Sequence, residues 1–100
     1  MDAAKVREEL RRAPLGAGWT VCTHAESVAL AQQLEREVGP GHALHGRPCV
    51  AVAKRGACED VLYFSEGALA EVRLTWRVPR DRGAFPWVRV FESVGAWRGA

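Results

Sequence analysis

Residues 61 to 76 read VLYFSEGALAEVRLTW and contain the strongest β-hairpin pattern in the chain. Val61 to Phe64 are rich in β-branched and aromatic side chains, and Ser65 to Gly67 can form a short turn. Residues 68 to 76 then alternate between apolar and polar side chains, which is typical of a strand with one buried face. The apolar positions are Ala68, Ala70, Val72, Leu74 and Trp76, and the polar ones are Glu71, Arg73, Thr75 and, beyond them, Arg77.

Further strands are expected on either side of this hairpin. Residues 49 to 53 form a short apolar run that suits a buried strand, and residues 87 to 91 alternate again and can add an edge strand. Residues 19 to 22 are a short extended candidate. Because consecutive strands joined by short turns pair antiparallel, we expect a meander.

Two amphipathic helices are predicted in the N-terminal part of the chain. Asp2 can cap the first helix, which ends before Pro14. Thr23 and Glu26 match a capping box at the start of the second helix. The apolar positions of this second helix recur at intervals of four, at Leu30, Leu34 and Val38.

The predicted fold class is therefore α+β, with one or two helices packed on a three- to four-stranded antiparallel meander sheet. Residues 1–100 are expected to form a single domain, because a chain of 100 residues can build one core but not two. The sequence leaves open whether the first helix lies on the same side of the sheet as the second. That choice decides whether Arg73, Thr75, Trp87 and Phe91 are surface or core.

The composition is that of an ordinary globular protein, with 48% hydrophobic and 26% charged residues and a formal net charge of +2. No secretory signal and no membrane span are expected, since Met1 to Lys5 precede no long apolar run. Cys22, Cys49 and Cys58 cannot all pair within one chain, which favours reduced thiols and a cytoplasmic location.

Three segments resemble a group of small bacterial proteins. The segments are Glu59 to Phe64, Val72 to Trp76, and the later Pro86-Trp87 with Phe91. The group carries a D-x-V-L-[FY] strand, a V-x-L-T-W strand and a Pro/Trp-containing segment behind them, and it often has His where this chain has Arg73. No activity is established for the group, so the resemblance implies a coherent domain and assigns no catalytic residue.

The polar side of the sheet is the candidate binding surface. Residues 72 to 98 contain six arginines, and alternation places aromatic rings among guanidinium groups if the polar sides of neighbouring strands align. Such a face can hold a protein partner, stack bases or bind an anion. If the first helix or the C-terminal tail covers it, the same rings are core. The candidate binding residues are Arg73, Thr75, Arg77, Trp87, Arg89 and Phe91.

A weaker candidate is a metal or catalytic site in the loop that carries His42, His45 and Cys49. Imidazole and thiolate are zinc ligands, but this spacing matches no familiar zinc class. A nucleophile set can also be assembled from Cys49 or Cys58 with one of these histidines, oriented by Glu59 or Asp60. The Glu59-Asp60 pair is better interpreted as the solvated start of a strand.

Taken together, the sequence favours a small intracellular, non-catalytic protein-binding or regulatory module, acting alone or as a homodimer. The first alternative is a nucleic-acid-binding protein that uses the basic, aromatic sheet face. The second is a small enzyme or metal protein around His42, His45 and Cys49. We expect no cofactor, a protein partner or self-association, and no membrane contact.

Overall fold

The computed structural model describes residues 2–16, 18–57, 59–76 and 87–100. In these ranges the chain forms three helices and five strands. In chain order the elements are α1 (Ala3–Arg11), β1 (Trp19–Val21), α2 (His24–Glu37), β2 (Val50–Arg55), β3 (Asp60–Ser65), β4 (Ala68–Arg73), β5 (Trp87–Phe91) and α3 (Val94–Arg98).

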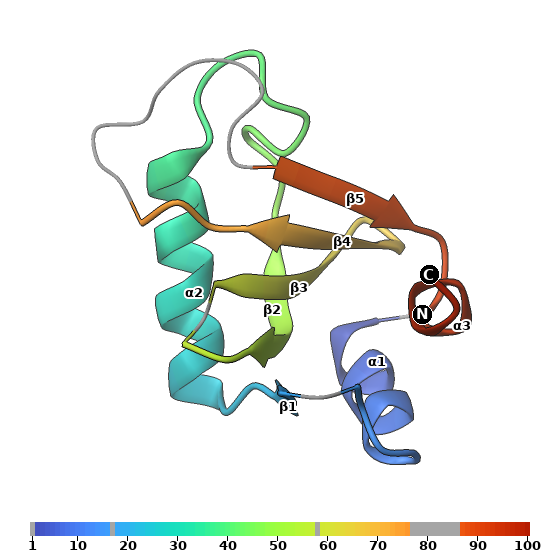
Figure 1. The fold of residues 1–100 in the computed structure, drawn as a ribbon. Coiled ribbons are helices and arrows are strands. Elements are labelled where there is room, and N and C mark those ends of the chain that lie inside the picture. Colours follow the sequence, from blue (N-terminus) through green and yellow to red (C-terminus); the bar gives the residue numbers. More distant parts are fainter. Residues whose placement is uncertain (1, 17, 58, 77–86) are drawn as a thin grey trace.

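The five strands form one antiparallel sheet in the order β1-β2-β3-β4-β5 (Figure 1). The predicted α+β class with an antiparallel sheet is confirmed. The predicted number of three or four strands is wrong, because the short β1 also pairs, with Trp19 opposite Arg55 and Val21 opposite Ala53. Three extended residues carry too little periodicity to reveal a pairing that depends on tertiary structure.

The predicted helix starts are confirmed by their capping hydrogen bonds. Asp2 accepts a bond from the backbone N–H of Lys5 at the start of α1. At the start of α2, Thr23 and Glu26 form both bonds of the capping box. Among the helices of the described ranges, none is long and apolar enough to cross a membrane.

One hydrophobic cluster lies between α2 and the sheet. Leu30 and Leu34 of α2 share it with Val61, Tyr63 and Val72 of the sheet. The Tyr63 ring is fully buried, and its hydroxyl donates a hydrogen bond of 2.7 Å to the Leu30 carbonyl. Because a buried hydroxyl without a partner is costly, this bond lets an aromatic residue fill the centre of the core.

A second hydrophobic cluster lies beneath α1 and α3. Figure 1 shows these two helices on the side of the sheet away from α2. Val6 and Leu10 of α1 and Trp97 of α3 pack there with Leu62 and Leu69. α1 and α2 therefore lie on opposite sides of the sheet, which answers the question that the sequence left open.

α3 was not predicted, because the sequence indicated only a C-terminal tail after the last strand. Ser93 caps this helix by accepting a hydrogen bond from the Ala96 N–H. The guanidinium of Arg98 donates to the carbonyls of Leu10, Ala13 and Pro14, where α1 ends. These carbonyl groups have no helical N–H as a partner, so a positively charged donor stabilises this end of α1. The Arg98 side chain thereby attaches α3 to α1.

The expected alternation of residues 68 to 76 holds only as far as Leu74. β4 ends at Arg73, and Trp76 has a φ angle of 60°, so the backbone leaves the pleat. Thr75 consequently faces α2: its N–H and hydroxyl both donate to the buried carboxylate of Glu37, at 2.6 and 2.8 Å. The predicted placement of Thr75 on the same face as Arg73 was wrong for this reason. The predicted burial of Trp76 in the core was also wrong, because Trp76 is half exposed.

Candidate functional site

A row of five charged and aromatic residues crosses the sheet on the side that carries α1 and α3. In the strand register, each residue of the row lies directly opposite the next one on the neighbouring strand. From β1 to β5 these residues are Trp19, Arg55, Asp60, Arg73 and Trp87. Side chains two residues apart on a strand share a face. The row therefore lies on the same face as Leu62, Leu69 and Phe91, which belong to or contact the cluster beneath α1 and α3.

Asp60 is the centre of this row. Its side chain is only 5% exposed, and it accepts two hydrogen bonds from Arg73, at 3.1 and 3.2 Å. Arg55 donates to the same carboxylate, and this hydrogen bond raises the pKa of Arg55 above its ordinary value. The expectation that Glu59-Asp60 is solvated was wrong for Asp60, because two guanidinium groups replace water around its carboxylate.

Aromatic rings extend the row at both ends. At the β1 end, the Arg55 guanidinium lies 5.3 Å from the centroid of the Trp19 ring, a cation–π distance. Trp19 in turn meets Trp97 of α3 edge to face, with the ring centroids 5.1 Å apart. At the β5 end, Trp87 is 66% exposed.

The exposed part of this face is the arginine–tryptophan patch, which we define as Arg55, Arg73, Trp87 and Arg89. The Arg73 side chain remains 62% exposed although it is bound to Asp60. Arg89 is also exposed, and its guanidinium lies 5.3 Å from the Phe91 ring centroid. α1 and α3 cover the opposite half of the face, where Leu69 is buried and Phe91 partly so.

Of the predicted binding residues, the structure brings Arg73, Trp87 and Arg89 together. Phe91 lies on the same side of β5 but packs partly against the cluster beneath α3. Thr75 is bound to Glu37 on the opposite side of the sheet, and Arg77 lies outside the described residues.

Sequence reasoning missed Arg55, and it named Asp60 only as a possible orienting group or as part of a solvated strand start, not as a partner of arginines. Arg55 is the last residue of β2 and lies directly opposite Asp60 across the hairpin. Opposite charges on the two sides of a short turn are a signal that could have suggested the pair.

The histidines of the loop between α2 and β2 are engaged by the backbone. His42 is buried, and its Nδ1 accepts a hydrogen bond of 3.0 Å from the Leu44 N–H. The Nδ1 of His45 lies 3.3 Å from the Val38 carbonyl oxygen. No cluster of three or more potential metal ligands is found in the described part of the chain. These contacts give both imidazoles a role in shaping the loop.

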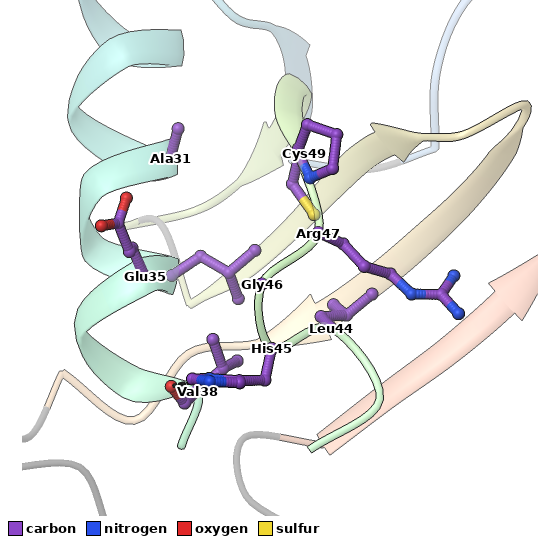
Figure 2. A pocket seen from close by; sticks show the side chains of 10 residues that line it. Ala31, Glu35, Val38, Leu44, His45, Gly46, Arg47 and Cys49 are labelled. Carbon is purple, nitrogen blue, oxygen red and sulfur yellow. Dashed lines mark hydrogen bonds between the residues drawn. The ribbon is translucent and has the colours of Figure 1, made fainter. Parts of the chain in front are cut away.

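A pocket of about 560 Å³ lies between α2 and this loop. Leu34, Val38 and Leu44 form its apolar wall, and His45 and Cys49 also line it. Figure 2 shows the Arg47 guanidinium extending away from α2. Burial raises the pKa of the Cys49 thiol, so this group is mostly neutral near pH 7 and a weak nucleophile. Cys58, the other thiol of the predicted set, lies outside the described residues.

Comparison with known proteins gives no match for this chain among family models, curated proteins or solved structures.

Proposed function

We propose that this chain is a non-catalytic protein-binding module that holds its partner on the arginine–tryptophan patch. One observation carries the proposal: the buried Asp60 carboxylate fixes Arg55 and Arg73 in a row that ends at the exposed ring of Trp87. Arginine and tryptophan are enriched among the residues that dominate binding energies at protein interfaces.

The hydrogen bonds of Asp60 support the proposal because they restrict the arginines before a partner arrives. A free arginine side chain loses rotational freedom when it binds, and that loss weakens the complex. Arg73 is already held through its Nε and one terminal nitrogen, while more than half of its side chain remains open to a partner. A planar guanidinium held in this way can still donate to a carboxylate or stack on an aromatic ring.

The charge of the patch favours protein over nucleic acid as the partner. Its three guanidinium groups share the face with the carboxylates of Asp60 and Glu71, so the formal charge of this described set is only +1. Binding to a phosphate backbone depends on several uncompensated cations. α1 and α3 also cover part of the face on which successive bases would stack.

Two features of the loop and the hairpin support a non-catalytic role. The Cys49 thiol is protonated more firmly than an ordinary cysteine because it is partly buried. Asp60, which was considered as a group that orients a histidine, is bound to two arginines instead. In this proposal the module works in the cytoplasm, a reducing compartment in which the thiols of Cys22 and Cys49 stay reduced.

The test is capture from the lysate of the native host, with the purified protein as bait and with nuclease and salt as variables. The proposal predicts a stoichiometric protein partner that survives nuclease treatment and is lost with Arg89→Glu. Arg11→Glu is the matched control, because it reverses an exposed arginine on α1 rather than in the patch. Recovery of nucleic acid alone, with a steep loss on raising the salt concentration, would contradict the proposal.

A further inference from the structure

β5 forms one edge of the sheet. It pairs with β4 along its whole length, and within the described ranges no strand lies on its outer side. The register runs without interruption from Phe91 opposite Leu69 to Trp87 opposite Arg73, whereas β2 is interrupted near Ala51. Since the outer side of an edge strand presents backbone N–H and C=O groups, β5 offers a regular template for an added strand.

Exposed apolar surface lies on both faces of this edge. Trp87 and Phe91 point to the side of the arginine–tryptophan patch, while Val88 and Val90 point to the α2 side. Val88 is half-buried, but Val90, the next residue on that side of β5, is 63% exposed. A strand laid along β5 would cover Val90 on one face and the flank of Trp87 on the other, which hydrophobic burial favours.

Arg89 gives this edge its charge preference. It is exposed in the middle of β5, and in the described part of the chain no carboxylate forms an ion pair with it. Glu71 lies opposite it on β4, but one oxygen of that carboxylate accepts a 2.9 Å hydrogen bond from the Trp97 indole. A carboxylate on an added strand could therefore form an ion pair with the Arg89 guanidinium, which has no such pair with the described residues of this chain.

The same charge disfavours a second copy of the chain on this edge. In a symmetric antiparallel pair with full overlap of β5, Arg89 would lie directly opposite its own symmetry mate. Like charges directly opposite one another destabilise a strand pair, and opposite charges stabilise it. Arg89 thus acts against self-pairing and in favour of an acidic strand.

We infer that β5 adds to the sheet an extended, acidic segment of a partner protein. A glutamate or aspartate of that segment faces Arg89, and the residues before and after it in the segment are apolar and cover Val88 and Val90. This inference rests on the protein-binding function proposed above and adds the chemistry of the partner and its mode of binding.

The test uses two capped peptides of about nine residues, one of alternating valine and glutamate and one of alternating valine and lysine. We expect the glutamate peptide to slow amide hydrogen exchange in residues 87 to 91 and to bind about fivefold more tightly than the lysine peptide. Arg89→Glu should reverse the preference between the two peptides, and Arg11→Glu should leave it unchanged.

Equal binding of both peptides, or no protection of residues 87 to 91 by the glutamate peptide, would overturn the inference. So would protection of β5 that appears without peptide and grows with protein concentration, since that is self-pairing. A protein captured from lysate that leaves the β5 amides unprotected would overturn the added strand but not the protein-binding function. The protein-binding function itself fails if no protein is captured, or if a captured protein is retained by folded variants of the arginine–tryptophan patch.

Discussion

Glu37 is a buried carboxylate whose removal should destabilise the fold sharply. It accepts four hydrogen bonds: from the Thr75 N–H and hydroxyl, from the Trp76 N–H at 2.8 Å, and from the Gln33 amide at 2.7 Å. Three of these bonds attach the segment just after β4 to the last turn of α2. Because a hydrogen bond to a charged group contributes about 1.5–3 kcal/mol, the two backbone bonds alone are worth at least about 3 kcal/mol.

Glu37→Ala should therefore lower the free energy of unfolding by about 3 kcal/mol, and Glu37→Gln by about half as much. The glutamine oxygen can replace only one of the two carboxylate oxygens, each of which accepts two bonds. Urea unfolding followed by circular dichroism measures both variants. Glu35→Ala is the control, since Glu35 is exposed on the same helix. If Glu37→Ala and Glu35→Ala differ by less than about 1 kcal/mol, the reasoning from these contacts is refuted.

Three further predictions concern other contacts. Asp60→Asn should lower the free energy of unfolding by about 1–2 kcal/mol. This is less than the loss of a fully buried ion pair, because Arg55 and Arg73 keep access to water. Thermal unfolding measures the change, and a loss above about 4 kcal/mol would contradict the estimate. Arg98→Ala should speed amide exchange in α1, because the Leu10 carbonyl of its last turn and the carbonyls of Ala13 and Pro14 just beyond it each lose a hydrogen bond. Unchanged exchange in α1 would contradict that role. Cys49 should react with iodoacetamide more slowly at pH 7.5 than an unfolded cysteine, because its raised pKa keeps it a thiol. Residue-resolved labelling that shows Cys49 reacting as fast as an unfolded cysteine, or faster, would contradict the account. The raised pKa also links protein stability to pH: the stabilisation is complete below the pKa of an unfolded cysteine and is lost as the pH rises through the pKa of the folded protein.

Much of the fold follows from local sequence patterns. The hairpin of β3 and β4 was predicted because alternation and turn chemistry agree there, and both capping motifs were predicted because their partners lie three residues apart. Local patterns could not show whether the shortest segments form a strand or a helix. β1 and α3 are stabilised by tertiary contacts, such as the edge-to-face packing of Trp19 on Trp97.

The candidate site could be predicted only in part. Alternation was enough to associate Arg73 with one face and to place Trp87 and Arg89 on one side of the next strand. Whether that face is covered depends on where α1 and α3 pack, which no residue pattern determines. The burial of Asp60 depends on a register between β2, β3 and β4 that brings two arginines to one carboxylate.

The loss of alternation after Leu74 has a similar origin. The sequence pattern predicts Thr75 as the next residue of a strand. In the structure, the N–H and hydroxyl of Thr75 instead donate to Glu37 on α2, which lies 38 positions away in the sequence. A buried acceptor supplied by another element outweighs the weak preference of a strand end to continue its pleat.

The central claim is that the arginine–tryptophan patch captures a protein partner. The most direct measurement compares partner capture by Trp87→Ala with capture by Val28→Ala, each checked by thermal unfolding. Both residues are exposed apolar side chains, but Val28 lies on α2, away from the patch. The account predicts that Val28→Ala retains the partner and Trp87→Ala loses it, with both proteins folded. Retention of the partner by a folded Trp87→Ala protein would contradict the claim.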